Sequence, residues 1–372
     1  MTGTGWKNAN TAAALQGAVA VVLLAIGAWQ GIGAITSEQG IQRLRPYLNL
    51  EAFLSGRLTG AVNTVLVHDL PADPLLRAAG GVLRYELFAS GGPQVRVGCD
   101  DTLFLTEELR PWPEPGPAMT ERAEGVRRVK DALAARGIAL AVAIVPDKAR
   151  VLAKQLCGAP LSAQAMQRHD DFLAALRGKG IDPVALLPAL QEQEARGGAW
   201  YRTDTHWNQE GAKAAAAAIA KALRDTPLSR AEDYRTSVAA EDTNGPGDLL
   251  RLMSLDHVPD ALRPAPDRQR LERTEMPESG GGLLDETPAP EVALIGSSYS
   301  LNANFHGALQ AALRGTVLNA ATAGGGFAGA ATTYFAGQSF RESPPKLVIW
   351  EIPERVVAQP LTQAERDFIA RW

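Results

Sequence analysis

An acid and an imidazole stand two positions apart in the segment YRTDTHWNQEGA, residues 201–212. Asp204 and His206 can act together, because a carboxylate can orient an imidazole and stabilise its protonated form. A second segment, VALIGSSYS (292–300), places Ser297 and Ser298 directly after an apolar run. A neutral serine is a weak nucleophile that needs a base, and histidine is the usual one. Together the segments predict a serine nucleophile with His206 as its base and Asp204 as the orienting acid.

Each segment alone also has a structural explanation. Asp204 can cap a turn beside a structural histidine, and small polar residues suit strand-to-helix turns. Spacing by itself therefore leaves catalytic and structural explanations open. A metal site is disfavoured, because no third histidine lies nearby and the chain has no His-x-x-x-His pattern. We expect no metal and no cofactor.

The elements that would position these residues form an alternating series. Apolar runs at 137–146, 292–296, 316–321 and 346–352 predict buried parallel strands. Helical patterns occupy 121–136, 162–177, 209–224, 301–314 and 328–341. Such alternation predicts an α/β fold with a parallel sheet flanked by helices. In these sheets ligands bind at the carboxyl ends of the strands, where Gly296, Ser297 and Ser298 fall. Helix N-terminal amides at that place can stabilise a developing oxyanion.

Local signals predict several further features. VRVGCDDTLFL (95–105) predicts a strand, a turn and a second strand, and Asn208 is a candidate N-cap for the helix at 209–224. The proline-rich stretch 110–120 predicts a loop ending at an N-cap, Thr120. Residues 226–290 predict irregular structure with a flexible piece at 278–282, and residues 40–90 predict helices with breaks at Pro71 and Pro74.

One segment is not typical of a globular domain. Residues 8–37 carry no charged side chain, and the run from Ala12 to Ala28 is interrupted only by Gln16. About 20 such residues suffice to cross a bilayer. A cleaved signal peptide and a buried helix are the alternatives, but the apolar run of a signal peptide has about 7 to 15 residues. We expect an uncleaved anchor at 1–37, a connector at 38–90 and the body of the protein, 91–372, outside the cytosol.

Charge and cysteine content narrow the possible partners. A net charge of −4 gives no basic excess for binding nucleic acid, so we expect no nucleic-acid partner. Cys99 and Cys157 both follow the predicted anchor, and an oxidising compartment would permit a disulfide between them. Two buried, unpaired cysteines are the equal alternative.

Several motifs resemble one family. YRTDTHWNQEGA and the downstream LIGSSYS resemble the SGNH-hydrolase-like polysaccharide O-acetyltransferases of the alginate acetylation system, the AlgJ/AlgX type. The segments AIVPDKARVL, GDLLRLM, LNAATAGGGF and VIWEIPERV are also similar to this family. QVRVGCDDTLFLTEEL is similar too, although Asp101-Thr102-Leu103 stands where Gly-Trp-Leu is expected. The resemblance implies an SGNH-hydrolase-like (flavodoxin-like) sheet with a permuted order, the acid and base preceding the serine.

The resemblance also implies roles for individual residues. The nucleophile of the family lies in a Gly-x-Ser-Tyr/Phe setting, which selects Ser298 rather than Ser297, with His206 as base and Asp204 as acid. Asn319 and Gly325, within the Gly324-Gly325-Gly326 turn, are implied at the oxyanion hole or acetyl pocket, and Tyr334 as a residue lining the site. The structural alternatives are a simple turn for the glycines and a core position for Tyr334.

Activity, partners and location follow from the same resemblance. It implies transfer of an acetyl group through a serine acetyl-enzyme onto hydroxyls of a secreted exopolysaccharide, alginate-like or cellulose-like. It also implies a membrane-bound O-acyltransferase as acetyl supplier and a single-pass protein of the inner membrane with its catalytic domain in the periplasm. The chain ends soon after the strand at 346–352, so we expect the membrane-anchored AlgJ-like type. A periplasmic acetylesterase and a non-catalytic carbohydrate-binding scaffold are the alternative functions.

Overall fold

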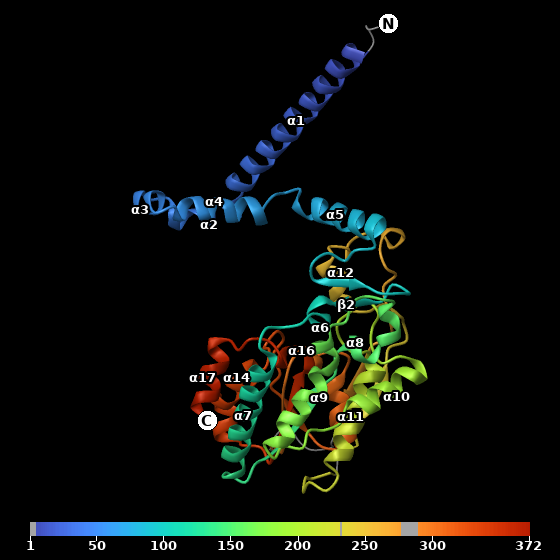
Figure 1. Ribbon diagram of the computed structural model, residues 1–372. Helices are drawn as coiled ribbons and strands as arrows, with labels where there is room; N and C mark the ends of the chain where they lie inside the picture. Colours follow the sequence, from blue (N-terminus) through green and yellow to red (C-terminus); the bar gives the residue numbers. More distant parts are fainter. Residues whose placement is uncertain (1–4, 231–232, 277–288) are drawn as a thin grey trace. The chain divides into compact units, whose positions relative to one another are not determined.

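The chain folds into two compact units, Met1–Leu83 and Arg84–Trp372, each described here by itself. The computed structural model describes residues 5–230, 233–276 and 289–372 (Figure 1). The flexible piece predicted at 278–282 lies outside the described residues. The division into an anchor, a connector and a catalytic domain stays a prediction, and the boundary between the compact units falls after Leu83.

The first unit consists of helices. Helix α1 (Gly5–Thr36) contains Ala13–Thr36, a stretch long and apolar enough to cross a membrane. One residue, Ser37, separates α1 from α2 and caps α2 through its side chain. The helices that follow are α2 (Glu38–Leu44), a 3₁₀ turn (Arg45–Tyr47), α3 (Leu50–Leu54), α4 (Arg57–His68) and α5 (Asp73–Phe88), which runs on into the second unit. The chain breaks at Pro71 as predicted, whereas Pro74 lies in the first turn of α5, where a missing N–H costs nothing.

The second unit is built around a parallel sheet of four strands in the order β3-β10-β8-β9. Its strands are β3 (Ala139–Val145), β8 (Val292–Ile295), β9 (Val317–Asn319) and β10 (Leu347–Pro353). Strand β10 is central, pairing with β3 on one side and with β8 on the other. The parallel α/β sheet predicted from the alternating pattern is confirmed.

Helices cover both faces of the sheet, and alternate strand residues enter two separate cores. Ala143, Leu294 and Ile349 pack on one face against helices α10, α11 and α13. Their chain neighbours point to the other face and pack against α7, α9, α14 and α17. Figure 1 shows these layers. The helices are α7 (Pro115–Ala134), α9 (Ala163–Gly178), α10 (Leu187–Gly197), α11 (Gln209–Ala222), α13 (Phe305–Leu313), α14 (Gly329–Ala336) and α17 (Gln363–Arg371).

Short elements complete the second unit. Strands β1 (Val95–Val97) and β2 (Leu103–Leu105) form the predicted hairpin, and the segment predicted irregular forms two small antiparallel pairs and α12. Those pairs are β4 (Arg235–Val238) with β7 (Glu272–Glu275) and β5 (Thr243–Asn244) with β6 (Arg268–Gln269), and α12 spans Asp248–Leu252. The remaining short helices are α6 (Thr106–Leu109), α8 (Lys148–Val151), α15 (Gln338–Glu342) and α16 (Glu354–Val357), with 3₁₀ turns at Ala153–Leu156, Asp260–Leu262 and Ser298–Ser300.

Two local expectations are corrected or decided. Helix α7 begins at Pro115, so Thr120 is no N-cap and its hydroxyl donates to the Gly116 carbonyl within the helix. Prolines are tolerated in a first turn, which is why the proline-rich stretch did not stop the helix. Cys99 and Cys157 form a disulfide, which decides between the two alternatives left open for these cysteines.

Candidate active site

Ser298, His206 and Asp204 lie in one continuous line of hydrogen bonds. The Nε2 atom of His206 is 2.8 Å from the Ser298 hydroxyl oxygen, and its Nδ1 atom is 2.7 Å from a carboxylate oxygen of Asp204. An ionised carboxylate only accepts hydrogen bonds, so Nδ1 carries the ring proton and Nε2 is left to accept the serine proton. The arrangement can raise the nucleophilicity of the serine oxygen.

The two neighbouring serines have different surroundings. Ser297 is buried, and both its hydroxyl and its backbone N–H donate to the carboxylate of Glu351, at 3.0 and 2.7 Å. Ser298 is partly exposed and its hydroxyl faces His206. The environment of each serine therefore suits Ser298 for attack on a substrate and Ser297 for holding the turn.

Glu351 organises the turn that carries Ser298. It lies on the central strand β10, fully buried, and also accepts a hydrogen bond of 2.9 Å from the Ser300 hydroxyl. Burial raises the pKa of Glu351, while the hydrogen bonds from Ser297 and Ser300 act in the opposite direction. Gly296 makes this close approach possible, because a Cβ there would lie 2.5 Å from a carboxylate oxygen of Glu351.

The two ends of the loop that carries Asp204 and His206 are held together. Trp200 and Trp207 form an antiparallel bridge, and the side chain of Asn208 caps α11 directly after it, as predicted. The side chain of Lys148 donates to the backbone carbonyls of Arg202 and Asp204 in this loop and to that of Leu103 in β2, at 2.7 to 3.0 Å. Burial lowers the pKa of this lysine to about 8.

Two further carboxylates hold the amides of the same loop. Asp267 accepts hydrogen bonds from the backbone N–H groups of Arg202 and Thr203, at 2.9 and 2.8 Å. Asp248 accepts one from the backbone N–H of Thr205 and one from its hydroxyl, both at 2.7 Å. The backbone of the loop is therefore fixed on several sides. A rigid loop keeps a catalytic base in position before the substrate binds.

Asp204 is the most deeply buried member of the trio. Its two carboxylate oxygens accept the backbone N–H groups of His206 and Asp248, at 2.9 and 2.7 Å. Burial alone would raise the pKa of Asp204, but His206 and the backbone donors outweigh it and lower the pKa to about 2. Asp204 is therefore ionised at neutral pH, as an acid that orients a histidine must be. Burial and the charge of Asp204 raise the pKa of Asp248.

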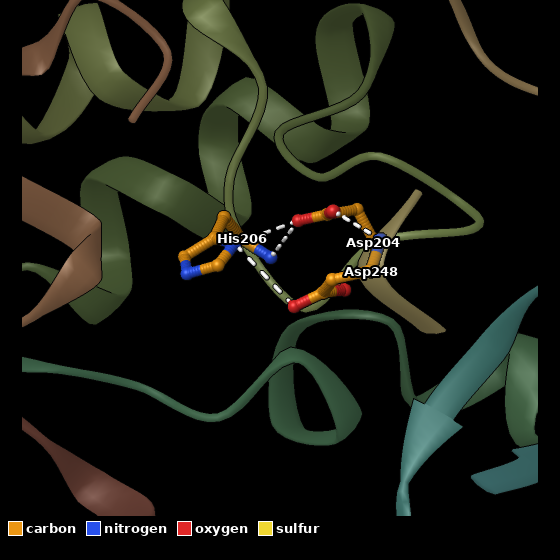
Figure 2. A group of neighbouring side chains, drawn as sticks. All are labelled: Asp204, His206 and Asp248. Atoms are coloured by element: carbon orange, nitrogen blue, oxygen red, sulfur yellow. Dashed lines mark hydrogen bonds and ion pairs between the residues drawn. The ribbon is translucent and has the colours of Figure 1, made fainter. Parts of the chain in front are cut away.

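Asp204, His206 and Asp248 also form a group whose possible ligand atoms lie within 4.8 Å of one another. Figure 2 shows the two carboxylates directed at the same imidazole. A cation there would need the Nδ1 lone pair, and so would displace the proton that Nδ1 shares with Asp204. The oxygens of both carboxylates already accept hydrogen bonds, those of Asp204 from backbone N–H groups and those of Asp248 from the backbone N–H and hydroxyl of Thr205. The group fits a shared proton better than a metal ion.

Tyr299, the residue after Ser298, packs beside the base. Its ring makes an edge contact with His206, with the ring centroids 5.0 Å apart, and its hydroxyl donates to the Thr205 carbonyl at 2.9 Å. The guanidinium of Arg355 lies over the tyrosine ring, 5.3 Å from its centroid. Tyr299 thus connects the serine turn to the histidine loop.

The three further residues named from the sequence have different positions. Asn319 ends β9 beside β8, and its side-chain amide donates to the Ser300 carbonyl at 2.9 Å. Gly325 lies in a turn whose residue Thr322 bonds the Gly296 carbonyl, so this turn approaches the serine turn. Tyr334 lies in the core, with its ring 5.4 Å from that of Phe340. The structure joins Asn319 to the serine turn, and gives Tyr334 a core position.

Sequence reasoning missed Glu351, Lys148, Asp248 and Asp267. Two of them carried a usable signal, because a glutamate inside an apolar strand and a lysine just after one must find buried partners. Asp248 and Asp267 lie in the segment predicted to be irregular, where no local pattern links them to a loop that precedes them by more than 40 residues.

Known proteins share this sequence and this fold. Residues 95–354 match the family described as "SGNH hydrolase-like domain, acetyltransferase AlgX". The chain is 34% identical to the "Probable alginate O-acetylase AlgJ" of Pseudomonas aeruginosa, over 86% of this chain and 85% of that protein. It is 32% identical to the protein of the same name from Pseudomonas putida, over 94% of this chain and 90% of the relative.

A solved structure agrees. The O-acetyltransferase domain of Pseudomonas putida AlgJ superposes with a TM-score of 0.67 at 33% identity, covering 75% of this chain and 98% of that domain. Pseudomonas aeruginosa AlgX, at 24% identity and a TM-score of 0.55, shares the fold. The family expected from the motifs is confirmed. With its parallel sheet and its similarity over most of its length, the chain belongs to the family of SGNH hydrolase-like acetyltransferases of the AlgX type.

Proposed function

We propose that this protein transfers acetyl groups onto hydroxyls of a secreted polysaccharide through an acetyl-enzyme formed on Ser298. The observation that carries the proposal is the hydrogen-bonded line from Asp204 through His206 to the Ser298 hydroxyl, with contacts of 2.7 and 2.8 Å. Relatives named as alginate O-acetylases support a polysaccharide acceptor, with an alginate-like polymer as the first to test.

The reaction has two halves. In the first, the Ser298 proton moves to His206 Nε2 as the serine oxygen bonds the acetyl carbon. The bond from that carbon to the donor breaks, and the leaving group takes the proton from His206. In the second half a sugar hydroxyl gives its proton to His206 and bonds the acetyl carbon. The bond to Ser298 then breaks and the serine oxygen regains the proton.

Asp204 keeps the imidazole in the reactive tautomer and stabilises its charged form in both halves. Asn319 is the candidate side-chain donor to the oxyanion, because it lies beside the serine turn and has a second amide hydrogen besides the one given to Ser300. Gly325 is a candidate for the wall of the acetyl pocket through its turn, and Tyr334 for a supporting role from the core.

The proposed location is the inner membrane, with 1–37 as the anchor, 38–90 as the connector and 91–372 as the catalytic domain on the periplasmic side. The helix Ala13–Thr36 supports the anchor, and the bridge between Cys99 and Cys157 supports an oxidising compartment. A membrane-bound O-acyltransferase is the proposed acetyl supplier, in keeping with the family. Such a partner would present the acetyl group on the same membrane.

The test is to trap the acetyl group and follow its fate. Purified full-length protein is mixed with a chromogenic acetyl ester, with and without deacetylated alginate, and digested for mass spectrometry. We expect an acetylated peptide that contains Ser298. We also expect the deacetylated alginate to speed ester turnover and to become acetylated. If ester turnover is the same with and without the polymer and yields free acetate, the protein is an esterase instead. Ser297→Ala is the matched control and should still form the acetyl-enzyme.

Wild-type protein that reacts with no acetyl ester and no serine-directed probe, yet binds the polymer, would overturn the proposal in favour of a carbohydrate-binding scaffold. Acetylation found on Ser297 rather than Ser298 would overturn the assignment of the nucleophile alone.

A further inference from the structure

Large hydrophobic side chains are exposed far more densely on residues 38–83 than on the second unit. Ten lie exposed in this short segment, against nine in all the described residues of Arg84–Trp372. The ten are Ile41, Tyr47, Leu48, Leu50, Phe53, Leu54, Val67, Leu75, Leu76 and Leu83. Soluble surfaces rarely expose apolar side chains in such number together, which indicates that something other than water covers them.

The segment touches α1 before that helix ends. Leu66 lies 3.2 Å from the position that a Cβ on Gly31 would take, and the side chain of Gln30 accepts the Ala72 N–H at 3.2 Å. α1 continues to Thr36, so at 1.5 Å per residue these contacts lie roughly 7 to 9 Å inside its end. Figure 1 shows α2 and α4 lying across this end of α1.

These contacts fix the depth of the segment if α1 crosses a bilayer. The 24 residues of Ala13–Thr36 span about 36 Å, more than the hydrocarbon core of about 30 Å. The last turn of α1 and the helices packed against it therefore lie at the boundary between headgroups and acyl chains. Amphipathic helices at that boundary bury their apolar side chains about 5 to 10 Å deep.

We propose that residues 38–83, which we call the collar, insert their exposed apolar side chains into the bilayer crossed by α1. The inference rests on the proposed membrane anchoring. Leu50, Phe53 and Leu54 fall at i, i+3 and i+4 and so share one face of α3. Because Ser37 alone separates α1 from α2, every inserted copy brings the collar to the same membrane surface. Lipid is thus the occupant that is always within reach.

The charges of the collar define which lipid surface it needs. Four acidic and four arginine side chains balance, and three of the arginines pair within the collar: Arg43 with Asp69, Arg57 with Glu51 and Arg77 with Asp73. No excess of positive charge remains to select anionic headgroups. Insertion should therefore depend on apolar burial and proceed equally in zwitterionic and anionic bilayers.

The test places spin labels on the full-length protein in vesicles of phosphatidylcholine. Both native cysteines are in the disulfide, so an engineered cysteine takes the label alone. Leu54→Cys reports the collar, Leu23→Cys reports the middle of α1, and Val238→Cys is the matched exposed apolar position of the second unit. Collision of the nitroxide with dissolved oxygen and with a water-soluble nickel complex gives the depth of each label.

We expect the label at Leu54 to collide more with oxygen than with nickel, as at Leu23, and the label at Val238 to show the reverse. Adding phosphatidylglycerol should not shift the Leu54 result. A water-exposed label at Leu54 beside a lipid-exposed label at Leu23 would overturn the collar proposal while leaving the anchor intact. It would instead favour a protein partner on this surface. Water exposure at both positions would show that the anchor itself is wrong.

Discussion

The two compact units use apolar and charged side chains in opposite ways. In the described part of Met1–Leu83 a small buried cluster is centred on Ala34, Leu44 and Val65, while other leucines, such as Leu50 and Leu54, are exposed. Arg84–Trp372 buries two large apolar clusters and also buries charged groups such as Lys148 and Glu351. Each of these charges is hydrogen-bonded to a loop next to Ser298 or His206. The first unit thus leaves much of its apolar surface exposed, whereas the second buries both its apolar side chains and the charged groups that hold its loops.

The largest effect is expected from variants of the hydrogen-bonded residues at the site. Ser298→Ala and His206→Ala should each lower acetyl turnover on the order of 10⁴-fold or more, because neither residue activates the nucleophile without the other. The double variant should be little worse than either single one. Acetyl-ester turnover gives the measurement, and an unchanged melting temperature is the folding control. Full activity in either single variant would show that the line of hydrogen bonds is not catalytic.

The disulfide should stabilise the second unit only. It joins residues 58 positions apart, for which chain entropy suggests a contribution of about 4 kcal/mol. Replacing both Cys99 and Cys157 with serine should lower the free energy of unfolding of that unit by about this amount. Urea unfolding with and without reductant measures it. An identical midpoint for wild type and variant would refute the expectation.

A single methyl group should disturb the buried carboxylate at the serine turn. In Gly296→Ala the new Cβ would meet Glu351 and the Ser300 hydroxyl at 2.5 and 2.7 Å, so overpacking should cost about 1 to 3 kcal/mol. Gly329→Ala is the matched control, since no atom lies within 4 Å of its added Cβ. Thermal melts compare the two variants. Equal melts would mean that the turn shifts freely and that Glu351 does not fix it.

Acid should weaken the second unit through Asp204. The pKa of this group is lowered from 3.8 to about 2, so the stability it contributes is present above pH 3.8 and is lost as the pH falls toward 2. The loss amounts to about 2 kcal/mol. Urea unfolding of wild type should therefore show a steeper fall in this window than that of Asp204→Asn. Parallel pH profiles for the two proteins would contradict the assignment.

The smallest effect is expected on the collar. Leu54→Ala should change the unfolding free energy by no more than about 0.5 kcal/mol, because the side chain is exposed. Leu44→Ala, a buried position of the same unit, should cost about 2 to 5 kcal/mol. Denaturation in mild detergent compares the pair. A large cost at Leu54 would mean that the leucine packs against protein, and the contrast between the units would weaken.

The fold was predictable because its buried strands stand out in the sequence as apolar runs. A strand buried on both faces is a continuous apolar run, as at 137–146, and a strand of this kind needs no contact information to be found. Helices α10 and α17 were not predicted, and α14 and α15 were predicted as one helix although Gly337 separates them. A local signal for α17 was present, because Thr362 and Glu365 form a capping box at its start.

The site residues that could be predicted are those that lie close together in the sequence or at the end of a predicted strand. Asp204 and His206 share one loop, and Ser298 sits at the strand end where a ligand is expected. The carboxylates of Asp248 and Glu351 accept backbone N–H groups of the site from residues 43 and 54 positions away. Such contacts exist only after the sheet has formed, so no spacing rule could reveal them. Catalytic roles for all these residues stay predictions until the variants above are made.

The position of β10 has a consequence for how the protein is made. This strand begins at Leu347, late in the chain, yet it is the only connection between β3 and β8 in the described sheet. A nascent chain that does not yet include β10 lacks the centre of the sheet, even when β3 and the loop of His206 are complete. His206 is then present, but the turn that carries Ser298 cannot yet be held in position. Assembly of the second unit is therefore a late event, and a chain stalled before Leu347 exposes strand edges that invite aggregation.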